Sequence, residues 1–214
     1  MLVYMLALLI CMGLGFRLWF RIKYPFWSRQ PVFHMHFLHW WLNPPGIIEK
    51  TLPKMNSNID QAHVTCFDSN SIPRSKIARH IGFLREHYLN TPSQRFSPTE
   101  KEYAPYFLGH GSPAFMADYC EKMMGRSGTS SGGTEVYELE EIRGLITGRP
   151  VFLCENGKRR PIYYVDYLCV HKSHRKKDIA TKLIATYFYE QRHRVPAIKS
   201  CLFKREGKLL NIVP

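Results

Sequence analysis

The chain has 214 residues, 45% of them hydrophobic, and a formal net charge of +13. A chain of this length can fold as one domain, with or without an appendage, around a core large enough to need no disulfide framework. The six cysteines are scattered and none has the CxxC spacing of zinc or redox sites, so we expect free thiols in a reducing compartment and no metal site.

The first 16 residues, MLVYMLALLICMGLGF, carry no charge and are followed by Arg17, Arg21 and Lys23. An apolar run with a basic C-terminal flank predicts a single-pass membrane anchor over residues 1–22, with the rest of the chain on the cytosolic side. The alternatives are a cleaved signal peptide and a buried N-terminal helix, but no basic region precedes the run and no A-x-A cleavage site follows it.

Residues 23–60 are aromatic and interrupted by proline, which predicts an extended arm rather than a packed repeat. His34, His36 and His39 lie in this arm without cysteine or acidic neighbours, so we do not expect them to bind a metal.

Residues 61–214 carry the pattern of a compact α+β domain. We expect strands at 63–68, 141–154 and 162–171, and helices at 75–89, 112–124 and 179–193. Asn156-Gly157 predicts a tight hairpin between the second and third strands, residues 126–133 a Gly/Ser-rich loop, and residues 200–214 a last strand pair around Glu206-Gly207.

Much of the excess positive charge lies near the end of the chain. Residues 158–208 hold 14 Lys or Arg against four acids, and the segment HKSHRKK (171–177) leads directly into the helix predicted at 179–193. The first N–H groups of a helix lack internal partners and carry the positive end of its dipole, so this junction predicts an anion site. The chain has no established RNA or DNA motif, and we expect no nucleic-acid partner.

Four segments then indicate a family. HRKKDIA (174–180) partly matches the Q/R-x-x-G-x-G/A phosphate loop of GNAT acetyltransferases, and YLCVHKSHRKKDIATKLI resembles the F-L-C-V-H-K-x-x-R-S-K-R-x-A-x-x-L-I block of N-myristoyltransferases. YPFWSRQPV (24–32), the region VTCFDSNS…FLREHYLN…RFSP (64–98) and IRGLITGRP (142–150) resemble further blocks of that family, in the same order. The resemblance covers about residues 24–214 and only the N-terminal half of the family. It implies a GNAT-like α/β/α fold.

The resemblance also implies an acyl-CoA site, with myristoyl-CoA or another acyl-CoA as co-substrate. By this similarity the backbone N–H groups of Tyr167 and Leu168 form the oxyanion hole. The adenosine would pack on Pro25, Phe26 and Trp27, the pantetheine and thioester along Tyr167, Leu168, Cys169 and Val170, and the phosphates on Arg175, Lys176, Lys177, Asp178, Ile179 and Ala180. Asp178 departs from the family pattern and puts a carboxylate beside the phosphates, unless it caps the helix.

The general base is the open question of this site. The family uses the carboxylate at the end of its second half, so the candidates here are the terminal carboxylate of Pro214, a partner chain or a missing segment. His171 is a further candidate, although a structural role is the simpler interpretation, and Cys169 is expected to be a small buried residue because direct transfer needs no acyl-enzyme.

The resemblance therefore implies an N-acyltransferase that moves myristoyl from myristoyl-CoA to the N-terminal glycine of a protein or peptide acceptor at a membrane. A short-chain GNAT acetyltransferase and a catalytically silent acyl-CoA-binding module remain as alternatives.

Overall fold

The computed structural model describes residues 2–32, 34, 42, 46–89, 95–128 and 134–203. It divides into two compact units, Met1–Thr51 with Glu206–Pro214, and Leu52–Arg205. In the first unit, helix α1 (Leu2–Lys23) is followed by the short 3-10 helix η1 (Trp27–Arg29). Helix α1 is long and apolar enough to cross a membrane, judged by length and composition. Its 22 residues span about 33 Å at 1.5 Å per residue.

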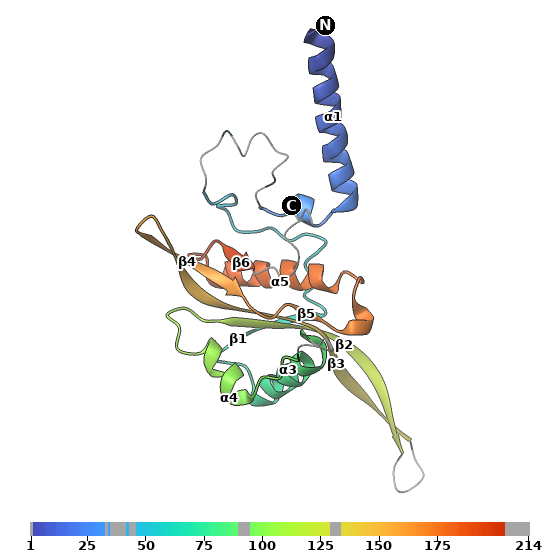
Figure 1. The fold of residues 1–214 in the computed structure, drawn as a ribbon. Coiled ribbons are helices and arrows are strands. Elements are labelled where there is room, and N and C mark those ends of the chain that lie inside the picture. The colour runs from blue at the N-terminus through green and yellow to red at the C-terminus, as the bar shows by residue number, and fades with distance from the viewer. Residues whose placement is uncertain are drawn as a thin grey trace. The chain divides into compact units, whose positions relative to one another are not determined.

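The second unit is a mixed sheet with helices on both faces (Figure 1). The strands are β1 (Val64–Asp68), β2 (Phe115–Gly128), β3 (Thr134–Glu155), β4 (Lys158–Val165), β5 (Cys169–Val170) and β6 (Cys201–Phe203). The helices are α3 (Arg74–His87), α4 (Glu100–Tyr103), η2 (Pro105–Phe107), η3 (Lys172–His174) and α5 (Ile179–Arg194). The order across the sheet is β1-β2-β3-β4-β6, antiparallel except for the parallel pair β4–β6.

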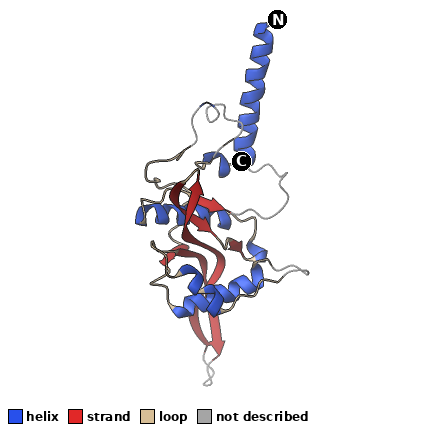
Figure 2. Ribbon diagram, turned by 60° about the vertical axis from the view of Figure 1, so that its left-hand side comes forward, coloured by secondary structure: helices blue, strands red, loops and turns tan. Residues whose placement is uncertain are grey.

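Two apolar cores lie on opposite faces of this sheet. On one face, Ile179, Leu183 and Tyr187 of α5 pack on side chains such as Phe115 and Ile146. On the other face, α3, α4 and η2 pack on Met116, Leu145 and Cys169, among others. Figure 2 shows helices on both sides of the strands. Residues 115–117 of β2 and 145–147 of β3 are therefore buried one after another, since both faces of the strands are covered.

The helix predicted at 112–124 is wrong, because residues 115–128 form strand β2 between β1 and β3. Phe115, Met116 and Ala117 are all buried, one after another, since helices cover both faces of the strand. Consecutive apolar residues do not show the period of two that marks a half-exposed strand. The predicted hairpin is confirmed, since Asn156 and Gly157 both have positive φ, at 48° and 74°, as a type I′ turn requires.

Strands β4 and β5 act as one interrupted strand beside β3. Val165 pairs with Gly148 and Cys169 pairs with Leu145, so residues 166–168 face only two residues of β3. This extra residue makes a β-bulge, a feature that turns backbone groups away from the ladder. The strand predicted at 162–171 is thus broken at its centre, at the position of the predicted oxyanion hole.

Candidate functional site

The bulge at 166–168 leaves one backbone donor unused. The Asp166 N–H donates to the Thr147 carbonyl at 3.0 Å, and the Tyr167 N–H donates to Thr147 Oγ1 at 3.2 Å. The Leu168 N–H donates to no acceptor within the described ranges. Of the two predicted oxyanion donors, the Leu168 N–H is therefore free. The Tyr167 N–H is bonded to the hydroxyl of the buried Thr147, and a ligand oxygen would have to replace that hydroxyl as its acceptor.

The Tyr167 side chain anchors this bulge rather than contributing an acid. Its ring lies 5.4 Å from the ring of Tyr88, 5.8 Å from that of Tyr103 and 6.2 Å from that of Phe107, measured between centroids. Burial raises the pKa of Tyr167 to about 12, with the nearby Asp166 acting in the same direction. The phenol stays protonated at neutral pH, and the aromatic contacts fix the backbone that carries the Leu168 N–H.

A second set of unused donors lies where the chain enters α5. The N–H groups of residues 175–181 donate to no described residue, and the first N–H bonded within the helix is that of Lys182, to the Asp178 carbonyl at 3.0 Å. Lys176 and Asp178 have positive φ, at 65° and 56°. This alternation of backbone conformation makes a concave row of N–H groups, which together with the helix dipole favours an anion.

The basic residues of the loop divide into two roles. Arg175 supports the loop itself, because its guanidinium donates to the carbonyls of Val170, at 3.3 Å, and His87, at 3.1 Å. Lys176 and Lys177 are exposed and form no ion pair with any described residue. The two lysines are thus available to a ligand.

Asp178 does not cap α5 with its side chain. It occupies the N-cap position in the left-handed conformation and makes no side-chain capping hydrogen bond. Its position is that of the glycine in the GNAT loop pattern, and aspartate is among the few non-glycine residues that tolerate this backbone conformation. The carboxylate therefore stays beside the anion site without neutralising any helix N–H.

Two glycines of β3 set how closely α5 packs on the sheet. A Cβ on Gly144 would lie 2.6 Å from Leu183 Cδ1 and 2.9 Å from Ile179 Cγ2, and a Cβ on Gly148 would collide with the Tyr187 hydroxyl. Ile179 is also the first residue of α5. The absence of a side chain at Gly144 thus allows the start of the helix, with its free N–H groups, to sit close to β3 and β5.

Three histidines gather at the base of the loop, although the sequence separates them widely. The ring centroid of His87, in the last turn of α3, lies 4.1 Å from that of His171, and His171 lies 5.0 Å from His174. The Ser173 hydroxyl lies 2.9 Å from Nδ1 of both His171 and His174. Burial and the charge of nearby His171 lower the pKa of His87 below its usual value. His171 is engaged in this network, which supports its structural interpretation over its role as a base.

Cys169 has the environment of a structural thiol. It is 5% exposed and packs in the core under α3. Burial raises the pKa of its thiol to about 12, so the thiolate that a nucleophile requires is scarce at neutral pH.

The remaining predicted residues lie elsewhere in the chain. Phe26 and Trp27 belong to the first unit, with their ring centroids 5.1 Å apart, and the Ser28 hydroxyl donates to the Pro25 carbonyl at 3.0 Å. Their part in binding adenosine stays a prediction. Pro214 lies outside the described residues, and its role as base also stays a prediction.

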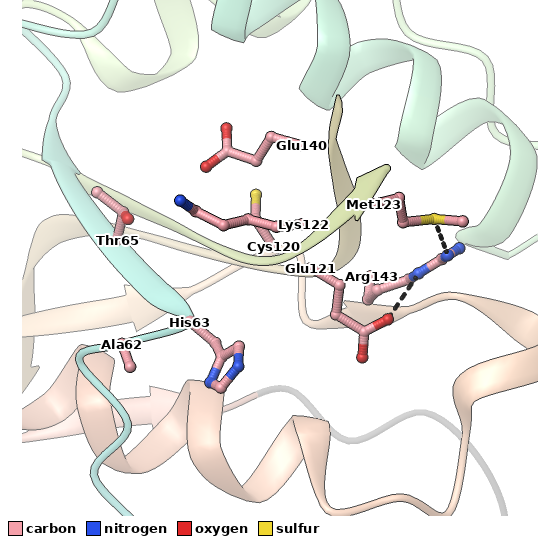
Figure 3. A pocket seen from close by; sticks show the side chains of 9 residues that line it. All are labelled: Ala62, His63, Thr65, Cys120, Glu121, Lys122, Met123, Glu140 and Arg143. Carbon is pink, nitrogen blue, oxygen red and sulfur yellow. Dashed lines mark hydrogen bonds and ion pairs between the residues drawn. The ribbon is translucent and has the colours of Figure 1, made fainter. Parts of the chain in front are cut away.

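A pocket of about 460 Å³ opens at the N-terminal end of β1, where β2 continues beyond its pairing with that strand (Figure 3). None of the predicted site residues lines it. The sequence pattern does not predict this pocket, since it indicates a helix over 112–124 where the structure has strand β2. Arg143 donates to the carboxylates of Glu121 and Glu141, and His174 reaches Glu121 at 3.9 Å, which links the pocket to the loop. Its lining residues are Ala62, His63, Thr65, Cys120, Glu121, Lys122, Met123, Glu140 and Arg143.

The described ranges hold no group of three or more His, Cys, Asp or Glu side chains placed to bind a metal ion. What the loop and the bulge offer is a set of backbone donors and lysines. Such groups bind phosphates and polarise carbonyl oxygens.

No protein-family model matches the chain, and no curated protein matches it in sequence. Solved structures of Saccharomyces cerevisiae N-myristoyltransferase with bound myristoyl-CoA are similar to it in fold. One is 19% identical with a TM-score of 0.56, and covers 84% of this chain and 40% of its own. Another is 17% identical with a TM-score of 0.57, and covers 90% of this chain and 43% of its own.

The chain therefore has the fold of the matched part of N-myristoyltransferase, and the predicted α/β/α fold is confirmed. It spans about two fifths of the length of the structures it matches.

Proposed function

We propose that the protein is an acyl-CoA-dependent N-acyltransferase that transfers myristoyl from myristoyl-CoA to the N-terminal glycine of a protein. The observation that carries the proposal is the pairing of two sets of free backbone donors. One is the row of N–H groups at 175–181, and the other is the Leu168 N–H in the bulge of the preceding strand. A CoA thioester needs both, one for its pyrophosphate and one for its carbonyl oxygen.

In this proposal the pyrophosphate binds the N–H groups at the start of α5, including those of Ile179 and Ala180. Lys176 and Lys177 add positive charge, and Arg175 holds the loop in place through its two carbonyl contacts. The pantetheine runs along Cys169 and Val170, next to the bulge. Backbone donors are well suited to phosphate because they are fixed before the ligand arrives.

The chemistry is a direct displacement at the thioester. The uncharged amine of the acceptor glycine attacks the carbonyl carbon, and the carbonyl oxygen gains negative charge. The Leu168 N–H donates to that oxygen, joined by Tyr167 when the oxygen replaces Thr147 Oγ1 as its acceptor. One such donor commonly lowers the barrier by about 3 kcal/mol. The C–S bond then breaks, CoA leaves as the thiolate, and the surplus proton of the amine passes to a general base.

We also propose that residues 1–22 anchor the protein in a membrane, with the acyltransferase unit on the cytosolic side. The support is the apolar helix α1 and the basic residues Arg17, Arg21 and Lys23 at its C-terminal end. An enzyme held there would release its lipid-modified products where they insert.

The test is a transfer assay with the full chain in detergent or lipid, offering acetyl-, octanoyl- and myristoyl-CoA to a peptide that begins with glycine. A matched peptide with an acetylated N-terminus is the control. Transfer of myristoyl to the free amine alone supports the proposal. Preferred transfer of acetyl supports a short-chain acetyltransferase, and binding of myristoyl-CoA without transfer supports a silent acyl-CoA-binding module. Failure to bind any CoA ester overturns all three.

A further inference from the structure

The hairpin of β3 and β4 combines exposed apolar side chains with unpaired positive charge. Phe152 is 61% exposed and Leu153 is 43% exposed, and Leu202 on the neighbouring strand β6 is 47% exposed. Lys158, Arg159 and Arg160 on β4 are exposed too, and form no ion pair with any described residue. Figure 1 shows this hairpin reaching past the end of α5.

The register places apolar and basic residues together on both faces of the hairpin. Leu153 pairs with Arg160 across the strands on one face, while Cys154 pairs with Arg159 on the other. The Arg159 guanidinium lies 4.6 Å from the centroid of the Phe152 ring. Arg159 and Arg160 thus lie opposite uncharged side chains, whereas Lys158 lies opposite Glu155, the one acid between residues 150 and 161.

We infer that this hairpin docks on the surface of a membrane that contains anionic lipids. Its apolar side chains fit the boundary between headgroups and acyl chains, and its cations fit the negative surface potential. A second and separate observation points to the same partner, since α1 has the length and composition of a membrane-spanning helix. A protein partner would need an acidic surface with apolar pockets, whereas a bilayer supplies both properties everywhere. The inference does not depend on the proposed enzymatic activity.

The experiment uses the full chain reconstituted in vesicles, with an environment-sensitive fluorophore on Cys154. This cysteine lies within the hairpin and is exposed; the other exposed cysteine in the described part of the chain, Cys11, is changed to serine. The labelled protein is compared in vesicles of phosphatidylcholine alone and of phosphatidylcholine with phosphatidylserine. We expect a blue shift of the emission with the anionic lipid, reversed by high salt. Equal emission in both kinds of vesicle overturns the inference.

A charge-removal variant tests the cations directly. Changing Lys158, Arg159 and Arg160 to serine should weaken docking by about fivefold for each charge removed. The matched control changes three other exposed, unpaired cations of the same unit, Lys54, Arg74 and Lys101, to serine. Equal loss in both variants would mean attraction by net charge alone and would overturn the inference.

The alternative partner of the hairpin is a second copy of the chain. Varying the number of chains per vesicle distinguishes self-association from docking on the lipid surface. A blue shift that grows with the number of chains per vesicle at constant lipid composition would assign the hairpin to self-association and overturn the inference. A shift that persists with a single chain per vesicle supports it.

Discussion

At the scale of single residues, the loop before α5 makes the sharpest predictions, because we propose that its lysines and its backbone donors bind the same ligand. Changing Lys176 and Lys177 to glutamate replaces two cations with two anions beside the free N–H groups, and should abolish detectable CoA binding. Isothermal titration with CoA measures the effect. Lys199→Glu, at another exposed lysine of the same unit, is the control and should bind as the unaltered chain does. Unchanged affinity in the double variant would contradict the placement of the phosphates.

Asp178 is a residue whose removal should improve binding. Its carboxylate lies at the entrance of α5 and caps no helix N–H, so it opposes the phosphates without a compensating bond. Asp178→Asn removes the charge and should strengthen CoA binding about fivefold at low ionic strength. Asp178→Gly should do the same and also raise the free energy of unfolding by about 0.5–1 kcal/mol, since glycine adopts positive φ without strain. Weaker CoA binding in both variants would indicate that the carboxylate contacts the ligand favourably.

At the scale of elements, the close packing of α5 on β3 is the feature to test. Gly144→Ala places a Cβ against Leu183 and Ile179, so the start of α5 must move away from the sheet. We expect a loss of about 1–3 kcal/mol in the free energy of unfolding, measured by denaturant titration, together with weaker CoA binding. The control is Gly82→Ala within α3, where a Cβ meets nothing within 4 Å. That variant should be stabilised by about 0.5–1 kcal/mol, because alanine favours a helix. Equal stability in the two variants would rule out the steric argument.

A buried ionic cluster joins α3 to β2 and should make stability depend on pH. Asp118 is fully buried, with Lys76 Nζ at 3.0 Å and His80 Nε2 at 3.4 Å from its carboxylate. Burial acts to raise the pKa of Asp118, but the bonds and charges of His80 and Lys76 outweigh it and hold this pKa below its usual value. Because this pKa is lower in the folded than in the unfolded protein, the ionised carboxylate stabilises the fold at pH values above the unfolded pKa, near 3.9. The stabilisation is lost as the pH falls through the lower pKa of the folded protein.

The test of this cluster is the variant Asp118→Asn. It leaves Lys76 without its buried partner and should cost about 3 kcal/mol at neutral pH. Below pH of about 4 the unaltered protein loses stability while the variant changes less, so the two unfolding curves converge. Asp178→Asn, at an exposed carboxylate, is the control and should keep the full pH dependence. If the free energy of unfolding of Asp118→Asn falls with pH in parallel with that of the unaltered protein, Asp118 is not the source of the acid sensitivity.

An element could be predicted from the sequence where interactions between neighbouring residues are enough to form it. The Asn156-Gly157 hairpin and helix α5, predicted at 179–193 and found at 179–194, rest on turn chemistry and on an apolar face. The short helix α4 was not predicted, although Thr99 and Glu102 form the capping box that marks its start. Strand β2 was misread because its burial on both faces is a property of the whole sheet.

Only part of the candidate site could likewise be predicted from the sequence. The loop followed from its charge and its position before a helix, since both are local properties. The bond from Tyr167 N–H to Thr147 Oγ1 requires two strands in register, and the contact of His87 with His171 requires α3 to end beside β5. Neither arises from neighbouring residues, so no local pattern predicts them.

At the scale of the whole molecule, the function of α1 decides where in the cell the protein is located. The positively charged side chains of this helix, Arg17, Arg21 and Lys23, lie in its C-terminal part, and almost all of its apolar side chains are exposed. A helix of this kind should stay in the membrane after alkaline extraction. Mass spectrometry of the extracted chain should find residues 1–22 still attached. A mature chain that begins after residue 22 would instead identify a cleaved signal peptide.

The contribution of the helix is measured by placing charge within it. Changing Leu8 and Leu9 to lysine adds about 2.5–3.5 kcal/mol per residue to the cost of insertion, so the double variant should be released by alkaline extraction. Leu52→Lys, at an exposed leucine outside α1, is the control and should remain bound. If the double variant is released and still transfers myristoyl to a soluble peptide, the helix determines location and the transfer does not require membrane insertion. If it is released without activity, the transfer itself depends on the membrane.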